Sequence, residues 1–200
     1  MKYRLVTLFL LVSFVFIAGA CSSTTTGPEQ PDYISYSNQQ PDSTIAWMYF
    51  SLDSNRVISP SDAQTALWDI KMPYLKCCGQ TKQIDIMLNS GNVGIGSTKG
   101  AMVDARFEDL DSVPAGTVLK EDDTAMAFRI VPVKLMGPGI MFSYDITKHT
   151  IQPSPDKCLI IQTTSGKLYK FQFTSIYKDA PAAPDMNTPL GYYHFRFAEL

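Results

Sequence analysis

The fold is decided near the C-terminus, where two stretches alternate between apolar and polar side chains. Residues 169–174 read Tyr-Lys-Phe-Gln-Phe-Thr, and residues 193–197 read Tyr-His-Phe-Arg-Phe. A period of two places successive side chains on opposite faces of a β-strand, so each stretch predicts a strand with one apolar and one solvated face. Residues 83–88, Gln-Ile-Asp-Ile-Met-Leu, follow the same alternation less regularly.

Shorter apolar runs, separated by Gly, Pro, Asn, Asp and Ser, predict further strands. They occupy residues 46–52, 67–72, 102–107, 126–133, 141–144 and 158–162. Helical evidence is confined to residues 60–66, which predict one short helix with Ser59 or Ser61 as its N-cap. About nine strands and so little helix predict an all-β fold, rich in antiparallel pairing, with few short helices.

The N-terminus has the pattern of an export signal. Lys2 and Arg4 precede an apolar run from Leu5 to Ile17, and small residues then lead to Cys21. The run is shorter than the about 20 apolar residues of a membrane span, so it predicts cleavage and export. A Cys in this position resembles the lipid-modified first residue of a bacterial lipoprotein. Plain secretion with a free Cys21 is the alternative.

The chain is predicted to have three parts. Residues 1–20 are the lipoprotein signal peptide. Residues 21–41 are rich in Ser, Thr, Gly, Pro and Gln and poor in aliphatic side chains, which predicts a flexible tether. Residues 42–200 are expected to form one β domain of ordinary size.

Charge and composition argue against several function classes. The 17 Lys and Arg against 19 Asp and Glu offer no support for nucleic-acid binding. Two histidines, His149 and His194, are few for a hydrolytic metal site or a catalytic triad. Cys77 and Cys78 are adjacent and lack the spacing of a redox or zinc motif; one of them pairs with Cys158, or the thiols are small buried side chains. The sequence therefore predicts a protein that is not an enzyme.

Two further patterns indicate turns. The Gly-rich stretch from Gly91 to Gly100 has Ser97 where a phosphate-binding loop requires Lys, and no helical pattern follows it. It predicts a turn or bulge region. The acidic groups at residues 108–109 and 121–123 lack the ligand spacing of a calcium loop, so they predict solvated turns.

The nine methionines are the unusual feature of the composition. Met136 and Met141 flank a Gly-Pro-Gly sequence at residues 137–139, which is expected at a loop tip. A soft thioether there suits haem iron or Cu(I). The structural alternative is that each Met fills an irregular gap in the core.

Several short segments, in order along the mature chain, together resemble the HmuY-type family of haem-binding lipoproteins. They are Trp68-Asp69-Ile70, Leu88-Asn89-Ser90-Gly91, Val113-Pro114, Tyr144-Asp145, residues 149–153, residues 166–171 and residues 191–197. The resemblance implies an all-β fold and attachment to the outer membrane through lipid on Cys21. It also implies capture of haem and its transfer to a TonB-dependent receptor during iron and haem acquisition.

The resemblance also implies an axial ligand pair, since family members clamp the iron with two His or two Met. Both His residues of this chain fit structural positions better, which leaves methionine. Met126, Met136 and Met141 lie in the stretch where the ligand loops of the family are expected, so they are the predicted haem-binding residues, with Met136 and Met141 as the predicted metal contacts. One of the three is expected to belong to the core. The alternative function is an exported lipoprotein of the same fold that binds a protein or glycan partner without haem.

Overall fold

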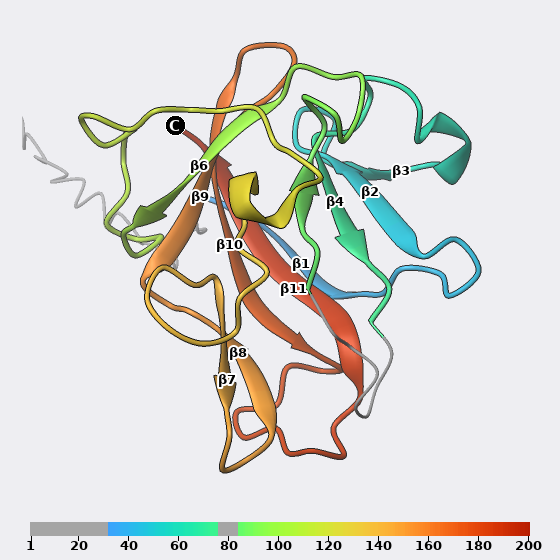
Figure 1. Ribbon diagram of the computed structural model, residues 1–200, viewed down its shortest axis with the longest axis vertical. Coiled ribbons are helices and arrows are strands. Elements are labelled where there is room, and N and C mark those ends of the chain that lie inside the picture. The colour runs from blue at the N-terminus through green and yellow to red at the C-terminus, as the bar shows by residue number, and fades with distance from the viewer. Residues whose placement is uncertain (1–31, 76–83) are drawn as a thin grey trace, which may run out of the picture. The chain divides into compact units, whose positions relative to one another are not determined.

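The computed structural model describes residues 32–75 and 84–200 (Figure 1). Within these residues the protein is all-β: every strand pair is antiparallel, and the helices are two short 3-10 turns, η1 (Pro60–Asp62) and η2 (Met126–Phe128). The predicted fold class is confirmed. The strands are β1 (Ile34–Gln39), β2 (Trp47–Ser51), β3 (Arg56–Ile58), β4 (Ile70–Pro73), β5 (Met87–Leu88), β6 (Lys99–Asp104), β7 (Phe142–Asp145), β8 (Thr150–Pro153), β9 (Lys157–Gln162), β10 (Leu168–Tyr177) and β11 (Leu190–Glu199).

The larger sheet has the strand order β1-β11-β10-β9-β6. Its centre is formed by β10 and β11, the two strands with the clear alternation. The aromatic side chains of both strands share one face, where Phe171 stacks on Phe195 with ring centroids 5.1 Å apart. The opposite, polar face is partly covered as well, because residues 105–119 fold over it and bury Phe107 and Leu110.

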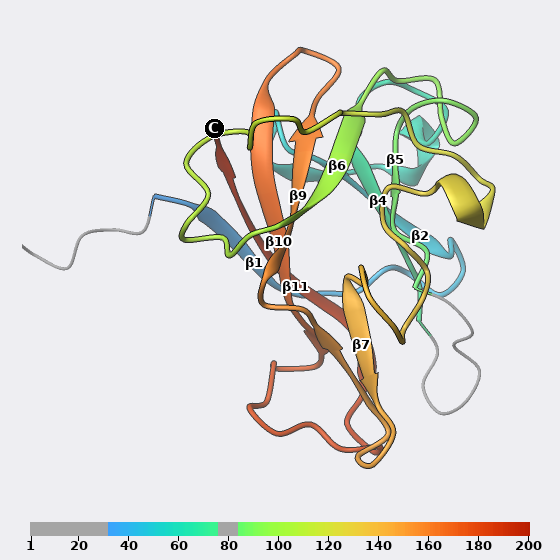
Figure 2. The same cartoon turned by 60° about the vertical axis from the view of Figure 1, so that its left-hand side comes forward.

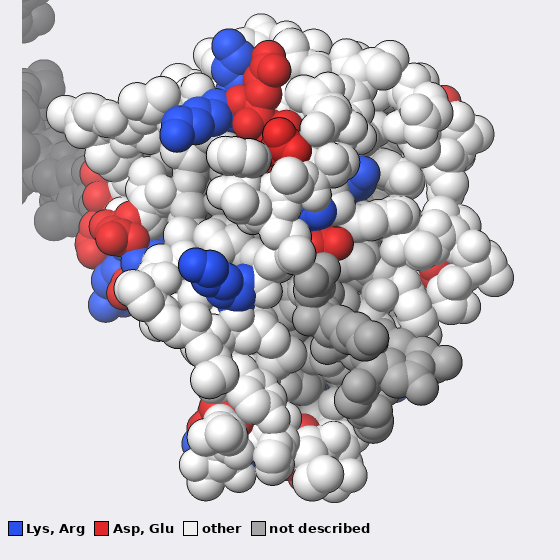
Figure 3. Space-filling view, in the orientation of Figure 1, with Lys and Arg blue, Asp and Glu red and all other residues white. Residues whose placement is uncertain are grey.

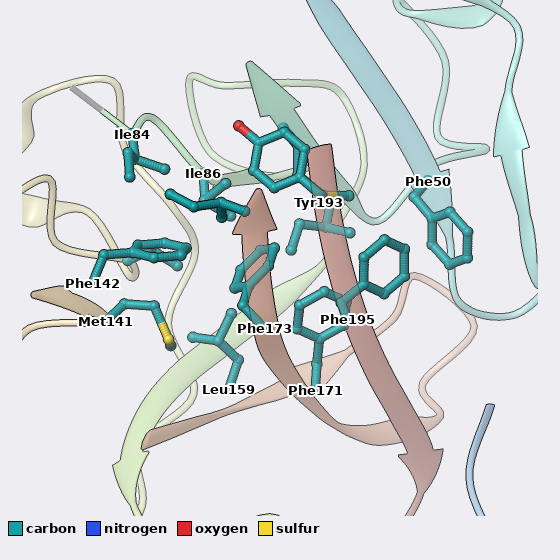
Figure 4. Close-up of a cluster of buried hydrophobic side chains, with 14 of the residues drawn as sticks. Phe50, Ile84, Ile86, Met141, Phe142, Leu159, Phe171, Phe173, Tyr193 and Phe195 are labelled. Atoms are coloured by element: carbon teal, nitrogen blue, oxygen red, sulfur yellow. The ribbon is translucent and has the colours of Figure 1, made fainter. Parts of the chain in front are cut away.

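The main core lies between this sheet and a four-stranded sheet of order β3-β2-β4-β5. Phe50 of β2 meets Phe195 edge to face at 5.1 Å, and Met141 and Phe142 border the same cluster (Figure 4). Burial of such side chains contributes about 1.5–3 kcal/mol each. A third, two-stranded sheet of β7 and β8 lies beside the loop between β10 and β11 (Figures 1 and 2).

Residues 34–39, predicted as part of the flexible tether, form strand β1 instead. Ile34, Ser35 and Tyr36 pair with the edge of β11, and the Tyr36 ring stacks on Phe195 at 5.3 Å. Pairing with a preformed edge orders a segment that has little apolar surface of its own, so the folded part begins before residue 42. Cys21 and the predicted signal peptide lie outside the described residues.

Residues 126–133, predicted as a strand, form η2 and irregular backbone. Two of their N–H groups bond locally rather than to a neighbouring strand: the Phe128 N–H donates to the Ala125 carbonyl, and the Ile130 N–H donates to a carboxylate oxygen of Asp122, both at 3.0 Å. The predicted short helix near residue 60 is the 3-10 turn η1, and Ser59 caps it by accepting the Ser61 N–H. Among the described residues, no helix is long and apolar enough to cross a membrane.

Candidate functional site

A groove of about 730 Å³ opens along β6, the edge strand of the larger sheet. Residues 100–103 of β6 form one wall, residues 116–118 and 120–121 form the second, and residues 127–130 at the end of η2 form the third. The volume is within the about 300–1,000 Å³ of typical small-molecule sites. Figure 3 shows the face that carries η2, with basic and acidic side chains side by side in its upper part.

Asp122 holds the η2 segment in place. Its side chain is only 3% exposed, and its carboxylate accepts the N–H groups of Leu88 at 2.8 Å and Ile130 at 3.0 Å. A buried carboxylate is tolerated because hydrogen bonds satisfy it. These bonds tie η2 to β5 and leave Met126 and Phe128 at the surface, where they are 55% and 71% exposed.

Arg129 supplies a buried positive charge at the base of the η2 segment. Its Nη1 lies 2.7 Å from a carboxylate oxygen of Asp85, and its Nη2 donates to the Thr124 carbonyl at 2.8 Å. The pKa of Lys71 is lowered, chiefly because that side chain is partly buried and secondly because the positive charge of Arg129 is near it. The exposed cation on the groove wall is Lys120.

The three predicted methionines differ in burial. Met126 begins η2, next to the groove residues 127–130, and Met136 lies in an exposed loop where it is 64% exposed. Gly137 and Gly139 of that loop have positive φ values of 95° and 68°, as expected at a tip. Met141 is fully buried, and Figure 4 shows its side chain pointing toward Leu159 in the main core. Met141 is therefore the methionine that the structure assigns to packing.

Both histidines make hydrogen bonds within the protein. His149 lies in the turn between β7 and β8 with a positive φ of 53°, and its Nδ1 lies 2.6 Å from the Tyr144 hydroxyl. His194 is buried in β11 with its Nε2 2.8 Å from the Tyr177 carbonyl, and burial lowers its pKa. Both contacts fit the structural positions that the sequence indicated.

Asn89 is a structural residue that the sequence analysis missed. It is fully buried, donates through Nδ2 to the Thr65 and Trp68 carbonyls, and accepts the Gly96 N–H at 3.0 Å. A Cβ atom on Gly94 would lie 2.1 Å from its Oδ1, and one on Gly96 would lie 2.8 Å from its Cγ. The glycines therefore make room for the Asn89 amide. The spacing of Gly94 and Gly96 after Asn89 was the available signal.

The described part of the chain contains one cysteine, Cys158. Cys158 is a free, fully buried thiol, and burial raises its pKa to about 11. Cys77 and Cys78 lie outside the described residues. Within residues 32–75 and 84–200, no group of three or more His, Cys, Asp or Glu side chains could hold a metal ion.

A smaller cleft of about 380 Å³ lies at the end of β2, lined in part by Asp53, Asp69 and Thr164. Asp69 is 3% exposed and accepts the Leu52 N–H at 2.8 Å. Burial raises the pKa of this carboxyl to about 6, and the nearby Asp53 charge adds to the shift.

Comparison with known proteins gives structural neighbours only. No family model and no curated protein matches the sequence. A Bacteroides vulgatus protein designated HmuY-like and haem-binding is 13% identical, with 82% of this chain and 89% of that chain covered and a TM-score of 0.46. The apo HmuY analogue of Tannerella forsythia is 15% identical, covering 82% and 95%, with a TM-score of 0.45. A Bacteroides fragilis protein designated a lipoprotein is 12% identical, covering 82% and 88%, with a TM-score of 0.40. All three TM-scores are below 0.5, and no residue of this chain takes a role from these proteins.

Proposed function

We propose that this protein is an exported lipoprotein that captures haem and passes it to a TonB-dependent receptor. In this proposal lipid on Cys21 anchors it in the outer membrane, and it acts by binding alone, without catalysing a reaction. The observation that carries the proposal is the groove beside β6, with the exposed Phe128 side chain in its lining and the exposed Met126 directly before the lining residue Ala127 in the chain. The proposal also draws on the sequence resemblance described above.

The groove offers a porphyrin one aromatic side chain and one exposed cation. A porphyrin is a flat apolar disc, and its burial contributes about 25 cal/mol for each Å² removed from water. The Phe128 ring, 71% exposed, can stack on such a disc. Lys120 can pair with a propionate, although exposed ion pairs of this kind contribute only about 0–1 kcal/mol.

The sulfur ligands are then Met126 and Met136, since both side chains are exposed and Met141 is buried. A neutral thioether stabilises ferrous iron relative to ferric iron and raises the reduction potential compared with imidazole. A site with two such ligands therefore holds reduced haem more tightly than oxidised haem. In the loop that carries Met136, a Cβ on Gly137 or Gly139 would meet no atom within 4 Å, so this loop has space around its tip.

Haem titrations under reducing and oxidising conditions test the proposal. We expect a low-spin ferrous spectrum and a much weaker ferric one. Met126→Ala and Met136→Ala should each weaken the ferrous spectrum, and Phe128→Ala should lower the affinity. Met186→Ala is the matched control, because Met186 is 63% exposed in the loop between β10 and β11, outside the groove. Absence of a spectral change in both redox states would refute haem binding.

A second candidate is a lipoprotein of this fold that binds a protein or glycan partner without haem. The lining of the groove favours it, because neither Met126 nor Met136 is among the residues that line it. The mixed charges of Lys120, Glu121 and Asp123 on the groove would suit a polar partner. Saturable binding to a glycan array by a protein that shows no haem spectrum would support this candidate.

A further inference from the structure

The outer edge of β6 is paired at only one point. Gly100 and Lys120 exchange two backbone hydrogen bonds, N–H to carbonyl, of 2.9 and 3.0 Å, and across the described residues this is the only bridge to the free side of β6. Hydrogen-bonding groups of a strand alternate in direction, so the N–H and C=O of Met102 face the same free side as those of Gly100. Met102 therefore offers an open pairing position beside an existing one.

The segment before Lys120 has the register to fill that position. Continued antiparallel from the Gly100–Lys120 bridge, the register brings Leu119 opposite Ala101 and Val118 opposite Met102. Residues opposite one another share a face of the sheet. Leu119 already packs with the cluster on the outer face, the face of Val103, whereas Met102 packs against the main core. Val118 would join Met102 on the core face.

In the structure this pairing is not made. Val118 is 65% exposed, and Met102 and Val118 stand on different walls of the groove. Figures 1 and 2 both show the chain leaving the end of β6 and returning across its beginning. The groove is thus the opening between an edge strand and a segment that could be its next neighbour.

The ends of the segment suit a hinged movement. Lys120 is fixed to Gly100, and on the other side a turn closes with the Thr117 N–H donating to the Pro114 carbonyl at 3.1 Å. Gly116 in this turn has a φ of 83°, a conformation that L side chains rarely adopt, and a Cβ there would meet no atom within 4 Å. Rotation at Gly116 can move Val118 while Lys120 stays bridged to Gly100.

We propose that residues 116–119 form a strap that pairs with the free edge of β6 and closes the groove. Closure adds the Met102–Val118 pair and removes Val118 from water, whereas a ligand in the groove keeps the strap open. The closed strap and the bound ligand therefore exclude one another. The ligand part of this inference rests on the proposed function, with haem as the ligand; the movement of the strap does not.

Thiol crosslinking tests the strap. Met102→Cys and Val118→Cys are introduced into the full chain, with Cys21, Cys77 and Cys78 replaced by Ser and the buried Cys158 kept. Hydrogen-bonded antiparallel pairs have Cα atoms about 5.5 Å apart, within reach of dibromobimane, whose thioether links survive reductants. Val103→Cys with Val118→Cys is the matched control, since these side chains lie on opposite faces of the closed register.

We expect the Met102–Val118 pair to crosslink at least about tenfold faster than the control. We also expect the locked protein to bind ferrous haem at least about tenfold more weakly than the unlocked protein, because affinity falls with the fraction of open molecules. Crosslinking no faster than the control would refute the strap. Unchanged haem binding after locking would refute the exclusion of ligand. Absence of a haem spectrum before locking would refute the proposed function, and the crosslinking rates would still decide the strap.

Discussion

Replacement of Met141 distinguishes a core methionine from an iron ligand. Met141 has no exposed surface and lies in the main core, so Met141→Ala deletes buried atoms and leaves a cavity. Such substitutions cost about 2–5 kcal/mol. At about 2–4 °C for each kcal/mol in a domain of this size, the melting temperature should fall by roughly 4–20 °C. Met136→Ala, at a side chain that is 64% exposed, should change stability by less than about 0.5 kcal/mol.

Met141→Leu distinguishes the role of side-chain volume at this position from the role of the sulfur atom. Leucine keeps the core nearly filled, so the cost should stay below about 1.5 kcal/mol, but it removes the thioether. Urea unfolding and the ferrous haem spectrum are measured for Met141→Leu, Met141→Ala and Met136→Ala. Our structural assignment predicts an unchanged spectrum for Met141→Leu. Loss of that spectrum with stability intact would show that Met141 binds iron and that its packing role is wrong.

Three further predictions follow from particular side chains. Burial raises the pKa of Asp69 from the usual 3.8 of an aspartate to about 6, so its contribution to stability is complete below about pH 4 and is lost as the pH rises through 6. Relative to Asp69→Asn, the natural protein should gain up to about 3 kcal/mol of unfolding free energy between pH 7 and pH 4, measured by urea unfolding, and a difference between the two proteins that does not change with pH would contradict this. Gly96→Ala places a Cβ 2.8 Å from Cγ of Asn89 and should lower the free energy of unfolding by about 1–3 kcal/mol. Gly166→Ala is the control, because no atom lies near its Cβ and only the positive φ of Gly166 opposes the substitution. Equal losses of unfolding free energy in the two variants would exclude the close contact as the cause. Cys158 is fully buried and has a pKa of about 11, so its thiol should resist alkylation by iodoacetamide at pH 8 until the protein unfolds. Labelling is detected by peptide mass mapping, and stoichiometric labelling of the native protein would show that the thiol is accessible.

Local pattern was enough for the central strands. Residues 169–174 and 193–197 alternate so regularly that only a half-buried strand places all their aromatic side chains on one face. The structure adds that the polar face is also covered: Gln172 is 3% exposed and accepts hydrogen bonds from Arg196. That cover comes from residues 105–119, which are distant in sequence from both strands, so no local pattern indicates it.

Two wrong predictions share one cause. Residues 34–39 are too poor in aliphatic side chains to suggest a strand, and they become one because β11 offers an unpaired edge. Residues 126–133 are apolar enough to suggest a strand. They do not become one because the Asp122 side chain binds the Ile130 N–H and Asp85 binds the Arg129 side chain. The backbone partner of residues 34–39 is a strand near the other end of the chain, and the partner of the Ile130 N–H is the Asp122 side chain, eight residues away. In both segments a group outside the segment decides between strand and loop.

The sequence by itself determined the β class of the domain, its central pair of strands, and three methionines as candidate ligands. Which of those sulfurs a ligand can reach was decided by tertiary structure alone. Met136 and Met141 flank the same Gly-Pro-Gly turn, yet one is exposed and the other is sealed in the core. Side chains five residues apart can face opposite environments because burial depends on which surfaces the rest of the chain brings to each of them.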